Sequence, residues 1–299
     1  MPSCHEHLLH DGPLVTIRDS SCCERQSGPR AEEHARGNTI QFTRAGVYLT
    51  HRRSAGTHRT VVAEPAHVLL FNQGTPYRVS HPTDDGDSST VLDFPAAVAR
   101  EVTARHDRAA WRDDAPPFHA THVLATPELL LPLHGLRHAL VAGMASRMEA
   151  DEVALGILDT IARDAARGRD ARPVAQRAET RRARRELAEA VKARLAAAPT
   201  SDLTLPSLAR EVAASPFHLA RTFRTETGLP IHQYLLRLRL NLALDRLAEP
   251  STSLATLALD LGFASHAHFT ATFRRVFGVS PSGARTAMRR NRHRVTGAA

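Results

Sequence analysis

Two stretches of this chain repeat one pattern: residues 205–230 read LPSLAREVAASPFHLARTFRTETGLP, and residues 254–280 read LATLALDLGFASHAHFTATFRRVFGVS. The first apolar residues recur 49 positions later, with Leu205, Leu208, Ala209 and Val212 returning as Leu254, Leu257, Ala258 and Leu261. After one added residue the offset becomes 50, and Ser215, Leu219, Phe223, Arg224 and Gly228 return as Ser265, Phe269, Phe273, Arg274 and Gly278. Agreement of this length indicates an internal duplication.

Each copy predicts two short helices around a tight turn. The apolar residues of the first helix, spaced i, i+3, i+4 and i+7, share one face. A break follows at residues 213–214 and 262–263, where Gly262 can adopt the left-handed conformation that such a turn needs. Ser215 and Ser265 are suited to cap the second helix, and Gly228 and Gly278 are suited to end it.

The second helix of each copy has only two residues expected to face inward: Leu219 and Phe223 in the first copy, and Phe269 and Phe273 in the second. Its remaining positions are expected to be exposed. A short helix, a tight turn and a second helix with one free face predict a helix-turn-helix over residues 205–228 and another over residues 254–278.

The segment between the copies, residues 231–248, predicts a single helix that Pro250 stops. Roughly 18 residues correspond to a helix about 27 Å long. A rigid rod of that length can hold two recognition helices about one DNA turn, roughly 34 Å, apart. The residues expected on its apolar stripe are Ile231, Tyr234, Leu235, Leu238, Leu242 and Ala243.

These residues resemble the AraC/XylS family of transcriptional regulators. The match covers residues 186–289 and includes three motifs: LAR-x-F-x4-G from Leu219, Y-x2-RL from Tyr234, and A-x2-LGF-x4-HF-x3-FRR-x-FG-x-SP from Ala258. Where the family usually ends in SPxxYR, this chain has SPSGAR at residues 280–285, so the tyrosine is missing. The resemblance implies a sequence-specific regulator of transcription that binds double-stranded DNA and works with RNA polymerase.

By this resemblance, the second helix of each unit carries the DNA-binding residues. Arg221 can make two hydrogen bonds to guanine, and Phe217 can lie against a thymine methyl group. In the second unit, Arg274 and Arg275 lie further along the helix, where phosphate contacts are expected. The full implied set is Ser215, Phe217, Ala220, Arg221, Arg224, Ser265, His266, Ala267, Thr270, Arg274 and Arg275.

Basic residues concentrate in the repeated half of the chain. Residues 181–299 carry 19 Lys and Arg against 8 Asp and Glu, a net charge of +11, which leaves −3 for residues 1–180. This distribution is typical of a nucleic-acid-binding domain beside a near-neutral sensing or dimerisation domain. Lys192 is the only lysine. The run RRARR at residues 181–185 can contact phosphate or form a solvated face.

Residues 1–95 predict short antiparallel strands separated by turn-forming residues, at 14–18, 39–52, 60–63, 67–72, 77–80 and 90–94. No helix separates them, so we expect an antiparallel β-barrel or a double-sheet roll. The resemblance implies a cupin-like barrel whose apolar interior binds a small-molecule effector, with Phe71, Tyr77 and His81 in its lining. The fold class is α+β.

Residues 95–168 predict three helices, at 95–106, 126–145 and 149–167. Their apolar stripes can pack against the barrel or form the homodimer interface that the resemblance implies, and the two do not exclude each other. The predicted domains are a sensing and dimerisation domain at 1–168, a linker at 169–180 and a DNA-binding domain at 181–299.

Three cysteines predict no disulfide framework, and the N-terminus carries no secretory signal, so a cytoplasmic location is expected. No apolar run approaches the roughly 18 residues of a membrane span. The sequence names neither the effector nor the operator, and it leaves open whether transcription is raised or lowered.

Eighteen histidines raise a second hypothesis, a cupin-type metal-dependent enzyme fused to a DNA-binding domain. Its candidate ligands His51, His58, His67 and His81 lack the close spacing that such enzymes show. An N-terminal zinc site could use Cys4, His5, His7, His10, Cys22 and Cys23, but without Cys-x2-Cys spacing a mobile arm is expected instead. No catalytic residue, metal or cofactor is therefore assigned, and no Gly-rich phosphate loop or nucleophile elbow occurs.

Overall fold

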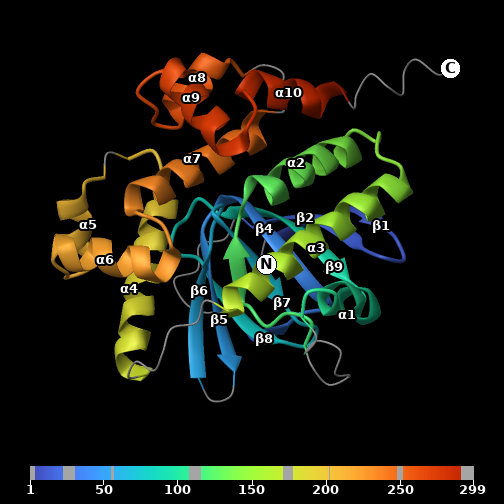
Figure 1. Cartoon of the computed structure of the whole chain (residues 1–299), viewed down its shortest axis with the longest axis horizontal. Helices are drawn as coiled ribbons and strands as arrows, with labels where there is room; N and C mark the ends of the chain where they lie inside the picture. Colours follow the sequence, from blue (N-terminus) through green and yellow to red (C-terminus); the bar gives the residue numbers. More distant parts are fainter. Residues whose placement is uncertain are drawn as a thin grey trace.

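A computed structural model describes residues 4–22, 31–54, 57–107, 116–170, 178–201, 203–247 and 252–290. Antiparallel strands dominate residues 4–94, and helices dominate the residues that follow (Figure 1). The α+β class predicted from the sequence is confirmed. The predicted linker falls mostly on residues 171–177, which lie outside the described residues. Pro250 also lies outside the described residues.

The strands form two antiparallel sheets. The six-stranded sheet has the order β1 (Cys4–Asp11), β2 (Thr16–Cys22), β9 (Asp87–Phe94), β4 (Asn38–Gly46), β7 (His67–Phe71) and β10 (His122–Leu124). The four-stranded sheet has the order β3 (Glu33–His34), β8 (Pro76–Ser80), β5 (Tyr48–Ser54) and β6 (Thr57–Ala63). The hydrogen-bonded order does not close into one ring, so the double-sheet roll describes the fold better than the closed barrel.

Gly46 marks the place where the chain passes from the first sheet to the second. Its φ is +79°, and a Cβ there would lie 2.1 Å from the backbone oxygen of Gly86. Only glycine fits such a turn. The predicted segment 39–52 is therefore divided between β4 and β5, which belong to different sheets.

Residues 4–11 form strand β1, so the prediction of a mobile arm is wrong for these residues. β1 pairs with β2 in a register that sets Cys4 opposite Cys22. These two cysteines form a disulfide, which the prediction from cysteine count did not include. Sequence reasoning missed β1 because its residues, CHEHLLHD, lack a strong apolar alternation.

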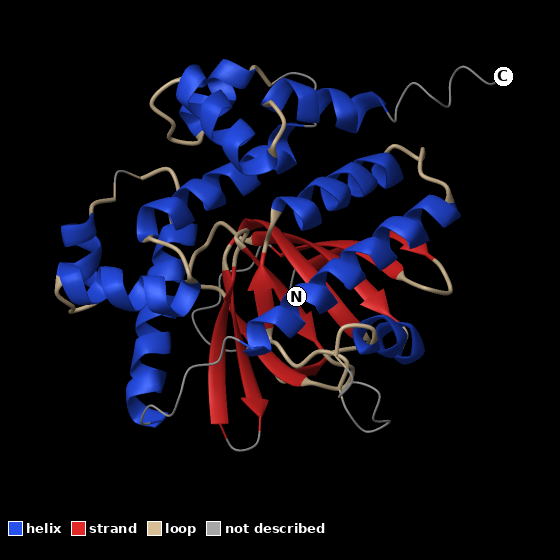
Figure 2. Cartoon of the chain, viewed as in Figure 1, coloured by secondary structure: helices blue, strands red, loops and turns tan. Residues whose placement is uncertain are grey.

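Three helices, α1 (Ala96–Ala104), α2 (Pro127–Val141) and α3 (Arg147–Asp170), cover one face of the six-stranded sheet (Figure 2). Their apolar stripes are buried against outward-facing strand residues such as Ile17, Leu92 and Phe94. Packing within the chain therefore accounts for the stripes of α2 and α3. Among the described residues, no helix has the length and apolar character to cross a membrane.

The C-terminal half consists of seven helices among the described residues. They are α4 (Ala178–Ala197), α5 (Leu205–Glu211), α6 (Pro216–Thr227), α7 (Ile231–Leu247), α8 (Leu254–Asp260), α9 (His266–Phe277) and α10 (Pro281–Arg290). In α10 the buried Ala284 stands where the family has its tyrosine. Arg285 holds this helix by donating to the backbone oxygens of Leu247 at 3.0 Å and Thr252 at 2.8 Å.

Helix α7 is buried on several faces, so the prediction of a single apolar stripe is wrong. Its first half contributes Tyr234 and Leu238 to a core shared with α4, α5 and α6. Its second half contributes Leu240, Leu244 and Leu247 to a core shared with α8 and α9. The second core is continuous with the layer of α2 and α3 on the sheet, so α7 needs apolar residues on several faces (Figure 1).

A buried polar network fastens the first half of α7 to the N-terminal domain. The Tyr234 hydroxyl donates to Glu64 Oε1 at 2.6 Å, and His67 Nδ1 lies 2.5 Å from the same oxygen. Lys192 of α4 is also buried, with its Nζ 3.0 Å from Glu189. The only lysine of the sequence therefore serves this interior contact.

The protonation states in this network follow from burial and charge. Burial raises the pKa of Glu64, but His67, Lys192 and Tyr234 together outweigh that effect and bring the pKa below its ordinary value. Burial, with Lys192 as the next cause, lowers the pKa of His67. Burial and the Glu64 carboxylate raise the pKa of Tyr234. The site therefore holds a carboxylate that accepts from a neutral tyrosine and a neutral histidine, with Lys192 as its cation.

An ion cluster fastens the second half of α7. Arg44 of β4 lies 3.1 Å from Asp245, and Arg137 of α2 lies 2.8 Å from Asp19 of β2 and 3.8 Å from Asp245. Burial raises the pKa of Asp245, but Arg44 and the other cations nearby outweigh it and lower the pKa. Asn241 adds a hydrogen bond of 2.6 Å to the Pro65 backbone oxygen.

Replacing Tyr234 by Phe should lower the free energy of unfolding by about 1–3 kcal/mol, because a buried carboxylate loses a donor. Tyr77→Phe is the matched control, since the hydrogen bond that Tyr77 donates to Glu33 is exposed to solvent. The control should cost no more than about 0.5 kcal/mol. Urea titration of both variants measures the difference, and equal losses would contradict the structural role of the Tyr234 hydroxyl.

Candidate functional site

Two helix-turn-helix units have the local geometry predicted from the sequence. The turn of the first unit places Ala213 at a φ of 50°, and the turn of the second places Gly262 at 73°. The hydroxyls of Ser215 and Ser265 accept from the backbone N–H of the third residue of the helix that follows, at 3.2 and 3.1 Å. Gly228 and Gly278 end those helices in the left-handed conformation.

The inward faces of α6 and α9 are wider than predicted. Leu219, Phe223, Phe269 and Phe273 are fully buried, as expected. Thr222, Thr272 and Phe277 are buried as well, although the sequence pattern predicts that they are exposed. Each threonine directly precedes a core phenylalanine, and a helical face of about 100° includes such a neighbour.

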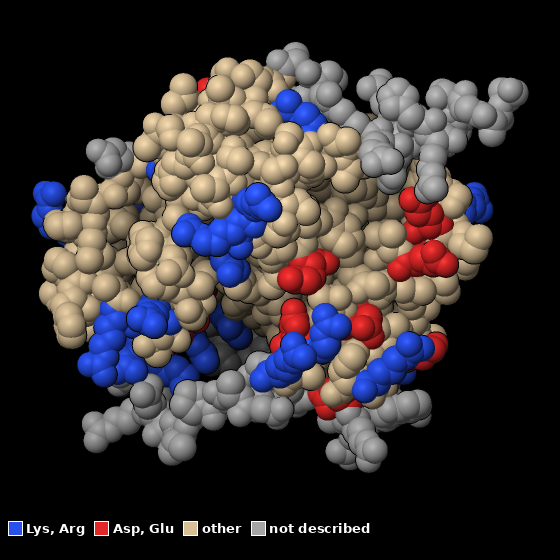
Figure 3. Space-filling view, turned by 45° about the horizontal axis from the view of Figure 1, so that its top comes forward, with Lys and Arg blue, Asp and Glu red and all other residues tan. Residues whose placement is uncertain are grey.

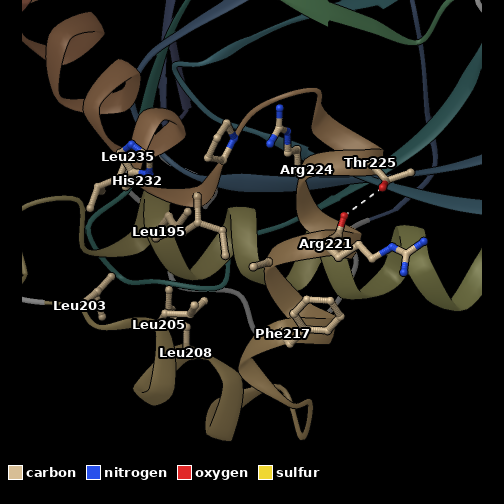
Figure 4. Close-up of a pocket in the computed structure, with 13 residues that line it drawn as sticks. Leu195, Leu203, Leu205, Leu208, Phe217, Arg221, Arg224, Thr225, His232 and Leu235 are labelled. Atoms are coloured by element: carbon tan, nitrogen blue, oxygen red, sulfur yellow. Dashed lines mark hydrogen bonds between the residues drawn. The ribbon is translucent and has the colours of Figure 1, made fainter.

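The outward face of α6 combines an aromatic ring with two guanidinium groups. Phe217 is 78% exposed, Arg221 and Arg224 are exposed, and Ala220 is half-buried. Their spacing places Phe217, Arg221 and Arg224 on one side of the helix. They line an open groove of about 740 Å³ whose floor is apolar and includes Leu195, Leu205 and Leu208 (Figure 4).

The outward face of α9 has a different chemistry. His266, Ala267, Arg274 and Arg275 are exposed, and Thr270 is half-buried. The Thr270 hydroxyl lies 3.4 Å from His266 Nε2. Both arginines occupy the last turn of the helix. This face therefore offers hydrogen-bonding groups at its start and positive charge at its end.

Arginines on α6 and α9 differ from other arginines of the C-terminal half. Among the described residues, no ion pair involves Arg221, Arg224, Arg274 or Arg275. In contrast, Arg194 pairs with Glu211 and Arg246 pairs with Asp260, each at 2.7 Å. Figure 3 shows Lys and Arg side chains with few acidic neighbours on the left of the view, and mixed charges on the right.

The run RRARR is partly engaged within the chain. Arg182 pairs with Glu186 at 2.7 Å, and Arg185 lies 4.0 Å from Glu226. Both arginines are exposed, so these pairs are weak constraints. Arg182 and Arg185 are therefore accessible to a phosphate as well as to solvent.

Residues 208–287 match the model of a helix-turn-helix domain family. The chain is 38% identical over 79 residues to the HTH-type transcriptional regulator ArgR of Pseudomonas aeruginosa, an alignment that covers 26% of this chain and 24% of ArgR. It is 34% identical over 83 residues to an AraC-like transcription regulator of Streptomyces lividans, covering 28% and 27%. The C-terminal part of the chain is therefore similar to the helix-turn-helix domains of AraC-type transcriptional regulators. The chain spans about a quarter of the length of these two relatives.

A solved structure is also similar to the C-terminal part of this chain. The DNA-binding domain of AdpA, determined in complex with a target DNA, is 33% identical. The alignment covers 36% of this chain and 96% of that chain, with a TM-score of 0.33.

A cavity of about 440 Å³ lies between the two sheets. Phe71, Tyr77 and His81 all line it, so the structure brings the three predicted effector residues together. The Phe71 and Tyr77 rings are 5.0 Å apart. Burial and Glu33 raise the pKa of Tyr77, which therefore stays protonated at neutral pH.

The expectation of an apolar interior is wrong for this cavity. Arg18, Thr39 and Asp93 also line it, and both Arg18 and Thr39 donate to the Asp93 carboxylate. The alternation of β2 and β9 explains the difference, because Ile17 and Leu92 point outward to the helices while their neighbours point inward. The cavity suits a ligand with polar groups as well as an apolar part.

The four histidines of the metal-enzyme hypothesis do not gather among the described residues. His51 bonds Ser80 at 2.7 Å, and His67 belongs to the α7 network. The side chain of His58 lies outside the described residues. His81 lies 2.8 Å from Asp87 at one end of the cavity. Of the N-terminal zinc candidates, Cys4 and Cys22 are together, whereas His10 pairs with Asp151 at 3.1 Å and Cys23 is outside the described residues.

Exchanging the turn residues of the two units should change stability in opposite directions. Ala213→Gly should raise the free energy of unfolding by up to about 1 kcal/mol, because an L-residue is strained in the left-handed region. Gly262→Ala should lower it by about 1–2 kcal/mol from the same strain, and its Cβ would meet the Arg239 guanidinium at 3.0 Å. Chemical denaturation of both variants measures the two signs, and a shared sign would contradict this account.

Proposed function

We propose that the regulator reads operator DNA with α6 and α9, placed in neighbouring major grooves by α7. The observation that carries this proposal is that both helices leave one face free, with exposed arginines that make no ion pair among the described residues. Helix α7 has 17 residues, which corresponds to about 25 Å. That length suits two helices that enter the major groove about one turn apart.

The two helices are proposed to read different features of the operator. Arg221 supplies the planar group that can bridge two guanine acceptors, and Phe217 supplies apolar contact for a thymine methyl. On α9, His266 and Thr270 can each make one hydrogen bond to a base. Arg274 and Arg275, at the end of α9, are proposed to contact phosphate, which positions the protein without reading sequence.

The Arg221→Ala and Arg274→Ala variants separate these roles. Arg221→Ala should relax base preference at one or two operator positions, a loss of roughly 1–3 kcal/mol in discrimination. Arg274→Ala should weaken binding evenly across sequences and reduce the log–log salt slope by about one. Binding of the full chain to an operator library at several salt concentrations measures both.

Two outcomes would contradict this assignment. Base preference altered by Arg274→Ala but unchanged by Arg221→Ala would mean that the second unit is the main reader. A salt slope near zero for the unaltered chain would contradict phosphate-driven binding itself, because released counterions dominate that slope. Arg246→Ala is a suitable control, since Arg246 is already paired with Asp260 at 2.7 Å.

We also propose that the regulator is a cytoplasmic homodimer that acts with RNA polymerase and has no enzymatic activity. We further propose that it binds a small-molecule effector in the cavity between its sheets. Phe71, Tyr77 and His81 are proposed to contact that effector, and Arg18 and Asp93 add polar partners. Exposed Val141 and Met148, near the α2–α3 connection, are available for a partner subunit.

The dimer and the effector site have separate tests. Light scattering of the full chain should give twice the monomer mass, and a monomer at all concentrations would contradict the dimer.

A metabolite screen by thermal shift should find ligands that stabilise the regulator but not its Tyr77→Ala variant. Ligands that stabilise both proteins equally would place the site outside the cavity.

A further inference from the structure

One end of the cavity gathers side chains of the kinds that bind transition metals. Strand register sets Cys4 of β1 opposite Cys22 of β2, and Cys22 opposite Asp87 of β9. Residues directly opposite each other on neighbouring strands lie on the same face of a sheet. The three side chains therefore form one row, and all three line the cavity.

The opposite sheet contributes a histidine to this row. His81 directly follows β8, is 4% exposed, and has its Nε2 2.8 Å from Asp87 Oδ1. Its second ring nitrogen, Nδ1, is buried and makes no hydrogen bond among the described residues. A buried polar atom of this kind is a candidate for a ligand contact.

The ligand atoms are close enough to share one ion. The Cys22 sulfur, a ring nitrogen of His81 and a carboxylate oxygen of Asp87 lie within 4.8 Å of one another. Thiolate, imidazole and carboxylate groups are the ligands that Zn²⁺ accepts in tetrahedral sites. Cys4, bonded to Cys22, is placed to become a fourth ligand when that bond is broken.

We propose that the reduced regulator binds one Zn²⁺ through Cys22, His81, Asp87 and Cys4, and that the Cys4–Cys22 disulfide is the metal-free form of the same site. The ion would join the six-stranded sheet to the four-stranded sheet at the end of the effector cavity. This proposal does not rest on the DNA-binding function, because metal binding can be measured without DNA.

The conversion between the two forms balances with a thiol reductant. Two low-molecular-weight thiols become one disulfide, and their two electrons and two protons convert Cys4–Cys22 to two thiols. Zn²⁺ then displaces both protons as it binds the thiolates. Cys4 is exposed, so a reductant can reach its sulfur, whereas Cys22 is 6% exposed.

The test uses the purified full chain after its disulfide has been reduced with a phosphine. The phosphine becomes a phosphine oxide by taking the oxygen of one water molecule. Co²⁺ should give tetrahedral d–d absorption and a thiolate-to-cobalt charge-transfer band, and one equivalent of Zn²⁺ should remove both. Competition with a chromophoric chelator then gives the affinity of the reduced chain for Zn²⁺. The disulfide form should bind Zn²⁺ at least about 100-fold more weakly, because both thiolates are lost.

Variants identify the ligands. Cys22→Ser and His81→Gln should weaken Zn²⁺ binding at least about 10- to 100-fold, with a smaller loss for Cys4→Ser. His81→Gln keeps both cysteines, so it remains informative if the Cys22 variant fails to fold. Cys23→Ser and His51→Gln are the matched controls and should bind like the unaltered chain; His51 bonds Ser80 and Thr60 instead.

Several results would overturn the proposal. Less than one-tenth of an equivalent of Zn²⁺ on the reduced chain would exclude the site. A cobalt complex without a thiolate band would exclude the cysteines as ligands. Equal losses in Cys22→Ser and Cys23→Ser, or an unchanged affinity in His81→Gln, would place the metal elsewhere.

Discussion

The burial of α7 is the constraint on which the rest of the C-terminal half depends. Tyr234 and Leu238 complete the core of the first helix-turn-helix, and Leu240, Leu244 and Leu247 complete that of the second. The same helix hydrogen-bonds to the N-terminal domain through Tyr234, Asn241 and Asp245. Rotating one unit alone would expose apolar side chains to water. It would also leave the buried carboxylate of Glu64 without one of its hydrogen-bond donors, and both changes cost free energy.

The network around Glu64 also determines how α7 is seated. Three donors reach this carboxylate: the Tyr234 hydroxyl, His67 Nδ1 and the backbone N–H of Ala66. A displaced α7 would lose the tyrosine donor. Strand β7 carries His67 at one end and the cavity-lining Phe71 at the other. The cavity between the sheets and the docking site of α7 are therefore built on one strand, which physically connects the proposed effector site to the helix that joins the two helix-turn-helix units.

Some features of the two sites could be predicted from the sequence, and others could not. Caps, turn residues and inward phenylalanines of the two units followed from local rules, because each depends on neighbours within a few positions. The placement of Phe71, Tyr77 and His81 on one cavity followed from the resemblance. The polar lining contributed by Arg18 and Asp93 was missed, because which face of β2 and β9 points inward depends on where the helices pack.

By itself, the sequence determined the duplication, both helix-turn-helix units, the α+β class and the basic C-terminal half. These features depend on the spacing of apolar residues, on the positions of glycine and serine, and on the distribution of charged residues along the chain. All of these can be read from short stretches of sequence. Only the tertiary structure decided that Lys192 is buried, that α7 is covered on several faces, and that Cys4, Cys22, Asp87 and His81 meet. Those contacts join residues up to 201 positions apart, as in the pair of Arg44 and Asp245, and such pairing depends on strand register and on how α7 docks against the sheets, which no local pattern specifies.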